Sequence, residues 1–175
     1  MQWLNQAVFF LKQIERSNNM INNMEKIIFL DIDGVLTNGQ YIQAILKEHN
    51  NEEDTIKRHI MELDPTNIAN VNKIIAATNA KVVITSTIRD KAYFPGVLKF
   101  LLEHNIPVIA TTKVLNYQKG EEIKRFLKEN PVNKYIILDD DYFAGFELPN
   151  FVQTDFNEGG LTEEKSKEAI RKLTR

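Results

Sequence analysis

Short apolar runs alternate with amphipathic segments along most of the chain. The runs are rich in branched residues, which predicts five buried β-strands, at residues 27–30, 82–84, 107–110, 135–138 and 151–153. The segments between them predict helices, at residues 65–77, 96–104, 120–129 and from 162 onward. Strands that alternate with helices predict a mainly parallel sheet covered on both faces, a Rossmann-like three-layer α/β/α architecture.

The start of the chain and residues 40–63 depart from this alternation. Apolar residues on one helical face predict a helix over residues 2–16, and an Asn-rich stretch then breaks the pattern. We therefore interpret residues 1–24 as an N-terminal helical extension of a domain that spans residues 25–175. The apolar face of this helix either packs on its own domain or forms a homodimer contact. Residues 40–63 are polar and are also expected to be helical.

Composition narrows the classes of protein. The 175 residues fit one domain, and a net charge of −2 disfavours a protein that binds nucleic acid over its whole surface. The chain has no cysteine, which excludes disulfides, thiolate metal sites and cysteine nucleophiles. No segment approaches the ~20 apolar residues that cross a bilayer, and the apolar stretch 7–11 lacks the basic leader of a secretory signal. We therefore expect a cytoplasmic protein without membrane partners.

Reactive side chains follow the predicted strands, where parallel α/β sheets bind their ligands. These residues, with one lysine that precedes the helix before the fourth strand, are Asp31, Asp33, Thr85, Ser86, Thr87, Lys119, Asp139, Asp140 and Asp141. Gly34 allows a sharp turn after the first strand, so the side chains of Asp31 and Asp33 can face one pocket. Clustered carboxylates repel one another unless a cation lies among them, and Mg²⁺ prefers oxygen ligands. Hydroxyls and an ammonium group would bind phosphoryl oxygens, so the sequence predicts magnesium-dependent phosphate chemistry.

The same residues carry a resemblance to a known family. Asp31-Ile32-Asp33-Gly34 is similar to the first motif of the haloacid dehalogenase (HAD) superfamily of phosphohydrolases. The matches to its three later motifs follow in the family's order, at Thr85, Lys119 and Asp139-Asp140. The chain more closely resembles the HAD domain of Swiss Army Knife RNA repair proteins, in the segments 64–65, 85–89, 120–123, 138–140 and 160–162. Ile88 departs from that branch, which usually has tryptophan there.

The resemblance implies a chemical role for each acid. Asp31 is expected to attack phosphorus and form an aspartyl-phosphate, while Asp33 protonates the leaving oxygen and later activates water. Mg²⁺ is expected on Asp31, on the backbone carbonyl of Asp33 and on an acid of the fourth motif. For that last ligand we favour Asp140 over Asp139.

The resemblance also implies which residues hold the phosphoryl group and the substrate. Thr85 and Lys119 are expected to steady the phosphoryl group during transfer. Lys113 is the rival for the role of Lys119, but the position of Lys119 before a helix N-terminus favours it. The candidate substrate-binding residues are Ser86, Arg89 and Gly34. Arg89 either binds a substrate phosphate or pairs with an acid such as Asp139.

Residues 37–64 form an insertion after the first motif, and insertions at this place act as caps in the HAD superfamily. We expect a small helical cap that leaves the pocket open, although these helices could instead merely flank the sheet. The resemblance thus implies a Mg²⁺-dependent phosphomonoesterase whose substrate is a small-molecule phosphate ester, such as a nucleotide, or a nucleic-acid end.

Two other classes of protein remain as alternatives. A signalling receiver domain also combines acids, a hydroxyl and a lysine around Mg²⁺, but in a different order along the chain. A non-catalytic phosphate-binding protein would need none of the catalytic residues, and this chain has every type. A calcium-binding EF-hand loop is excluded, because that loop needs glycine at its sixth position and glutamate at its twelfth, where this chain has Leu36 and Ile42.

Overall fold

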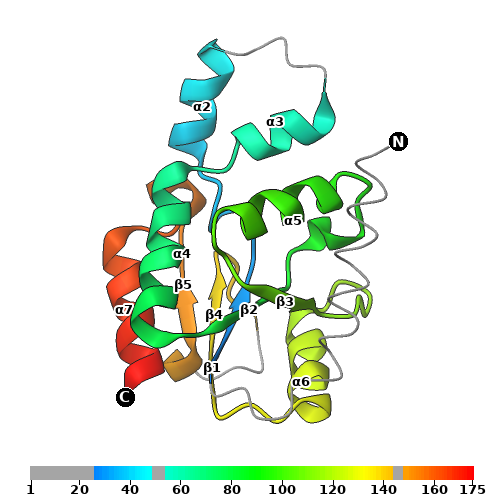
Figure 1. Cartoon of the computed structure of the whole chain (residues 1–175), viewed down its shortest axis with the longest axis vertical. Coiled ribbons are helices and arrows are strands. Elements are labelled where there is room, and N and C mark those ends of the chain that lie inside the picture. Colours follow the sequence, from blue (N-terminus) through cyan, green and yellow to red (C-terminus); the bar gives the residue numbers. More distant parts are fainter. Residues whose placement is uncertain (1–25, 49–53, 144–147) are drawn as a thin grey trace.

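Five parallel strands form one sheet in a computed structural model, which describes residues 26–48, 54–143 and 148–175. The strands are β1 (Lys26–Leu30), β2 (Lys81–Ile84), β3 (Val108–Thr111), β4 (Lys134–Asp139) and β5 (Phe151–Gln153). Their spatial order is β3-β2-β1-β4-β5 (Figure 1). The five predicted strands are confirmed, each within one residue at either end. From β1 the chain first adds β2 and β3 on one side, and it then crosses back to add β4 and β5 on the other side. In sheets with such a reversal, the ligand crevice lies beyond the carboxyl ends of the central strands.

The central strand β1 is buried on both faces. Ile27, Ile28, Phe29 and Leu30 are all fully buried, as a continuous apolar run in an inner strand requires. In the register of the sheet, Leu30 pairs with Ile84 of β2 and with Leu138 of β4. The residues that follow these three strands therefore meet at one edge of the sheet.

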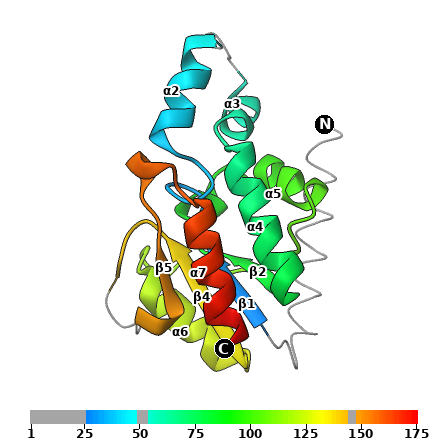
Figure 2. The same cartoon turned by 90° about the vertical axis from the view of Figure 1, so that its left-hand side faces the viewer.

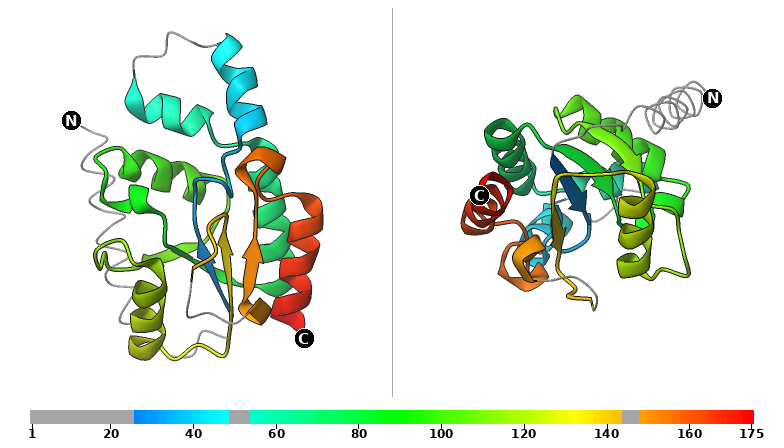
Figure 3. Two further views of the ribbon diagram at one scale, coloured as in Figure 1. Left: turned by 180° about the vertical axis from the view of Figure 1, so that it is seen from behind. Right: turned by 90° about the horizontal axis from the view of Figure 1, so that it is seen from below.

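Helices cover both faces of the sheet and complete the three-layer fold. Figure 3 shows α4 (Pro65–Thr78), α5 (Phe94–Glu103) and α7 (Glu163–Thr174) on one face and α6 (Lys119–Glu129) on the other. The side chain of Asp64 accepts a hydrogen bond from the backbone N–H of Thr66 and caps α4, and Thr162 caps α7 in the same way, as its sequence predicts. The four helices predicted at residues 65–77, 96–104, 120–129 and from 162 onward are thus confirmed, although α5 begins two residues earlier than expected.

Two short helices, α2 (Gly39–Glu48) and α3 (Thr55–Met61), stand beyond the carboxyl ends of the strands (Figures 1 and 2). The helical segment expected over residues 40–63 is therefore split, with residues 49–53 outside the described part of the chain. Helix α3 packs on α5 at Gly96, where an added Cβ would lie 2.3 Å from Cγ2 of Ile56. A glycine at this place lets the two helices approach closely.

The predicted N-terminal extension, with its possible homodimer contact, lies outside the described residues. Within the part of the chain that the structure describes, no helix has the length and apolar character needed to span a membrane.

Candidate active site

A tight turn after β1 brings two acids to one cavity. Gly34 adopts a φ of +72°, a conformation that suits glycine, and lets the chain reverse. Its N–H donates to Oγ1 of Thr37 at 3.1 Å, and its carbonyl accepts from Oγ1 of Thr154 at 2.8 Å. Asp31 and Asp33 consequently both line a cavity of about 740 Å³ at the carboxyl edge of the sheet. The expectation that both carboxylates face one pocket agrees with this geometry.

Lys119 joins the carboxylates that follow β1 and end β4. Its Nζ donates to Oδ2 of Asp31 and to both carboxylate oxygens of Asp139, at 2.9 and 3.1 Å. Burial lowers the pKa of Lys119, but the charges of Asp31 and Asp139 outweigh it and raise that pKa above its ordinary value. Lys119 therefore stays charged and compensates two carboxylates in a place with little access to water.

The carboxyl of Asp139 is the most perturbed acid of this group. Its side chain is fully buried. Burial and the neighbouring charge of Asp31 raise the pKa of Asp139 to about 7, against the opposing effect of Lys119. Its Oδ1 also accepts the backbone N–H of Asp141 at 3.1 Å. Both oxygens of Asp139 are thus engaged within the protein.

Three carboxylates converge where a cation could bind. Asp31, Asp139 and Asp140 each offer one oxygen, and these oxygens lie within 4.8 Å of one another. Asp140 lines the cavity beside Asp31 and packs on Gly34, where an added Cβ would lie 2.1 Å from its Oδ2. A donor set made only of oxygen fits Mg²⁺.

Asp33 differs from the other acids because its side chain is exposed to the cavity. Partial burial still raises the pKa of Asp33, and the carboxylate of Asp31 raises it further. His59 of α3 opposes this shift. A carboxyl group whose pKa is raised can hold a proton at higher pH and donate it, which suits an acid catalyst.

The loop after β2 carries three hydroxyl residues, and of these only Thr87, the residue after Ser86, is among the residues that line the cavity. Thr85 and Ser86 are fully buried, and their hydroxyl oxygens have no hydrogen-bond partner among the described residues. Buried hydroxyls without a partner are costly, so they are candidates to bind a ligand group. The sequence placed all three hydroxyls at this strand end but assigned a role only to Thr85 and Ser86.

Arg89 does not reach the carboxylates of β4. Its Nη2 donates to Oε2 of Glu122 on α6, and both side chains are almost completely buried. Of the two roles weighed for Arg89, pairing with an acid is the one that agrees with the structure, but the acid is Glu122 rather than Asp139. Sequence reasoning missed Glu122, because one of two adjacent acids in the first turn of a helix usually faces solvent.

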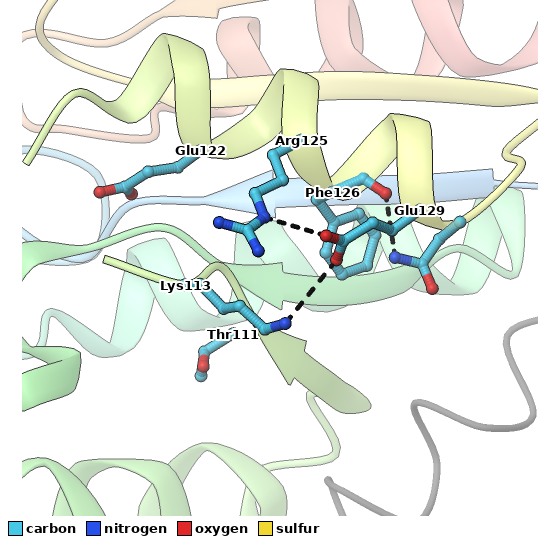
Figure 4. A pocket seen from close by; sticks show the side chains of 7 residues that line it. Thr111, Lys113, Glu122, Arg125, Phe126 and Glu129 are labelled. Carbon is cyan, nitrogen blue, oxygen red and sulfur yellow. Dashed lines mark hydrogen bonds and ion pairs between the residues drawn. The ribbon is translucent and has the colours of Figure 1, made fainter. Parts of the chain in front are cut away.

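Lys113, the rival of Lys119, lies at a separate and smaller cavity. This cavity of about 250 Å³ lies between the end of β3 and α6, and Figure 4 shows Lys113 and Arg125 both directed at Glu129. The Nζ of Lys113 lies 3.9 Å from Oε2 of Glu129, and the Nε of Arg125 lies 2.9 Å from Oε1. Lys119, and not Lys113, therefore contacts the strand-end carboxylates.

Aromatic side chains from two loops complete the wall of the larger cavity. Tyr117 lies on the loop before α6, with a φ of +57°, and its hydroxyl donates to Asp90 at 2.5 Å. Tyr142 and Phe143 follow β4, line the cavity and contact the ring of Phe151. Tyr117 was not predicted from the sequence, since nothing local indicates that its loop folds against the site.

Comparison with known proteins identifies the family of this chain. The model of a family described as the HAD domain in Swiss Army Knife RNA repair proteins matches residues 27–166, from β1 into α7. Neither a curated protein nor a solved structure matches the chain significantly. The matched segment contains every residue of the site described above.

Proposed function

The chain belongs to the family of HAD domains found in Swiss Army Knife RNA repair proteins, and we propose that it is a magnesium-dependent phosphomonoesterase that forms an aspartyl-phosphate. The observation that carries this proposal is the convergence of Asp31 and Asp139 on Lys119, beside a cavity that Asp33 and Asp140 also line. A carboxylate that an ammonium group holds in place can attack phosphorus, and a neighbouring acid can protonate the leaving oxygen. This arrangement therefore suits nucleophilic attack on a phosphate ester.

In the proposed first step, a carboxylate oxygen of Asp31 attacks phosphorus and the bond to the leaving oxygen breaks. Asp33 donates its proton to that oxygen, for which its raised pKa is suited. In the second step, Asp33 accepts a proton from water, and the water oxygen attacks phosphorus and releases phosphate from Asp31. The same residue thus acts as acid and then as base.

Lys119 and the hydroxyls after β2 are proposed to hold the phosphoryl group through both steps. Lys119 is among the residues that line the cavity, beside Asp31. The unpartnered hydroxyls of Thr85 and Ser86 can donate to phosphoryl oxygens when their side chains rotate toward a bound substrate on an unmoved backbone. Gly34 lets the backbone turn closely around the site.

The metal is assigned to Asp31, Asp140 and the backbone carbonyl of Asp33. Asp140 lines the cavity and Asp139 does not, which supports the choice of Asp140. Bound there, Mg²⁺ would supply positive charge that offsets the clustered carboxylates and the charge developing on the phosphoryl oxygens.

We also propose that residues 37–64 are a small cap of an otherwise single HAD-like domain over residues 25–175. Their helices lie at the carboxyl edge of the sheet (Figure 2), and none of their described residues lines the cavity. An open cavity with aromatic walls suits a nucleotide or a nucleic-acid end, which agrees with the RNA repair proteins that define the family.

Hydrolysis of p-nitrophenyl phosphate tests the proposal. We expect the wild-type protein to release phosphate with Mg²⁺ and not with a chelator, and we expect Asp31→Asn to lose at least about 10³-fold in kcat, because the nucleophile is gone. Asp155→Asn is the matched control, since Asn caps a helical turn as well as Asp and the residue lies outside the cavity. Equal activity in wild type and Asp31→Asn contradicts the mechanism, and a stable phosphoprotein without turnover favours a receiver-like role.

A further inference from the structure

A buried ion pair ties together the loops that surround the proposed phosphoryl site. Arg89 belongs to a short 3-10 turn, η2 (Thr87–Asp90), and Glu122 belongs to the first turn of α6. The exposed fractions of their side chains are 3% and 0%. A buried charge pair of this kind is costly to desolvate, and it is retained only where its hydrogen bonds are nearly complete.

The guanidinium of Arg89 binds backbone carbonyls beyond the ends of two strands. Its Nη1 donates to the carbonyls of Thr85 and Ser86, both at 2.5 Å, and its Nε donates to the carbonyl of Thr112 at 3.0 Å. The carbonyls of Thr85 and Thr112 lie past the ends of β2 and β3 and accept no other hydrogen bond from the described residues, whereas the carbonyl of Ser86 also accepts the backbone N–H of Arg89 at 3.2 Å. Arg89 thereby fixes the backbone that carries the hydroxyls of Thr85 and Ser86.

Glu122 connects the same guanidinium to the helix that carries Lys119. Its Oε1 accepts a hydrogen bond from the backbone N–H of Leu115 at 2.9 Å. Its Oε2 accepts a hydrogen bond from the Oγ1 hydroxyl of Thr112 at 3.3 Å. Lys119 begins α6 one turn before Glu122. The position of Glu122 therefore helps to set where the Nζ of Lys119 meets Asp31.

We propose that Arg89 and Glu122 are a positioning pair of the proposed phosphohydrolase: they hold the Thr85–Thr87 loop and Lys119 in fixed positions around Asp31. This inference rests on the proposed function. Neither side chain lies among the residues that line the larger cavity, so both act through their neighbours. A displacement of the phosphoryl-binding groups by about 1 Å can cost roughly 10²-fold in rate.

The test compares two variants of the pair with a matched control. Arg89→Lys keeps the charge but cannot reach three carbonyls and a carboxylate at once. The double variant Arg89→Gln/Glu122→Gln removes both charges and leaves no unpaired buried ion, so we expect it to fold. The control, Arg125→Gln/Glu129→Gln, removes the exposed Arg–Glu pair of the same helix, whose side chains are each 46% exposed.

Three measurements are made on each full-length variant: kcat on p-nitrophenyl phosphate, the affinity for tungstate by calorimetry, and thermal unfolding. Tungstate is an oxyanion that mimics phosphate and does not require turnover. Well below the unfolding temperature, we expect both pair variants to lose about 10- to 100-fold in kcat and to bind tungstate more weakly, while the control matches wild type.

Each outcome bears on the inference. If the double variant keeps wild-type kcat and tungstate affinity while unfolding at lower temperature, the pair is merely structural and the inference is wrong. If wild type does not hydrolyse p-nitrophenyl phosphate at all, the proposed function fails, but weaker tungstate binding by the pair variants still supports the positioning role. If Arg89→Lys does not fold, the double variant alone decides between the two.

Discussion

Gly34 meets two requirements that no other residue type meets together. Its φ of +72° is strained for residues with a side chain, and the space where its Cβ would lie is filled by Asp140. Asp140 is also the residue that we assign to the metal. The glycine therefore controls both the turn after Asp31 and the place of a carboxylate 106 positions further along the chain.

We expect Gly34→Ala to abolish hydrolysis of p-nitrophenyl phosphate and to weaken Mg²⁺ binding in calorimetry, because the new Cβ displaces the Asp140 carboxylate. Gly159→Ala is the control, since Gly159 has a φ of +93° but its nearest neighbour to an added Cβ is 3.8 Å away. Both variants bear a similar backbone strain of about 1–2 kcal/mol, so both lower the unfolding temperature. Normal Mg²⁺ affinity in Gly34→Ala would exclude Asp140 as a ligand.

Single residues of the site could be predicted where they follow a strand, and not where they depend on distant partners. Asp31, Thr85 and Asp139 come directly after or at the end of buried apolar runs, so their convergence follows from a parallel sheet. Glu121 and Glu122 are equivalent in the sequence, both in the first turn of a helix. The fold alone separates them: Glu121 is exposed and pairs with Lys124, whereas Glu122 is buried against Arg89.

At the scale of elements, the strands were predicted closely because a strand buried on both faces is apolar throughout its length. Helix boundaries were less certain. The prediction began α5 at Gly96, but the helix begins at Phe94 because Pro95 fits the first turn, where no N–H is needed. The prediction did not divide the polar segment 40–63 into α2 and α3, although Asp54 caps the start of α3, because neither helix contributes an apolar face that marks its ends.

The contact of α3 with α5 depends on Gly96, and its loss should release α3 without disturbing the site. In Gly96→Ala, the added Cβ would overlap Cγ2 of Ile56, so we expect faster hydrogen exchange over residues 55–61 by mass spectrometry. Hydrolysis of p-nitrophenyl phosphate should stay near the wild-type rate, because none of the described residues of α3 lines the cavity.

The double variant Gly96→Ala/Ile56→Ala is the matched control for this contact. It removes the overlapping methyl group and should return the hydrogen exchange of α3 toward the rate of Ile56→Ala alone. Unchanged exchange in Gly96→Ala would mean that α3 is not held by this contact. A large loss of hydrolysis in the same variant would instead mean that α3 takes part in the reaction of small substrates.

At the scale of the whole molecule, a chain with a net charge of only −2 gathers Asp31, Asp33, Asp139 and Asp140 at one edge of its sheet. Lys119 compensates part of this charge, and burial and Asp31 still raise the pKa of Asp139 to about 7. Asp139 therefore binds a proton more tightly in the folded chain than in the unfolded chain. The stability that this proton contributes is complete below about pH 4 and is lost as pH rises through about 7.

A divalent cation should reverse this dependence, because it binds the ionised carboxylates of the folded chain only. We expect Mg²⁺ to raise the unfolding temperature more near pH 8 than near pH 5, relative to the protein in a chelator. Asp140→Asn keeps Asp139 and Lys119 but lacks the assigned metal ligand. Its stability in a chelator should therefore still fall as pH rises, but Mg²⁺ should no longer raise its unfolding temperature. If Mg²⁺ raises the unfolding temperature of Asp140→Asn as much as that of wild type, Asp139 rather than Asp140 is the metal ligand. If Mg²⁺ does not change the unfolding temperature of wild type at either pH, the carboxylates are neutralised by Lys119 and protons alone.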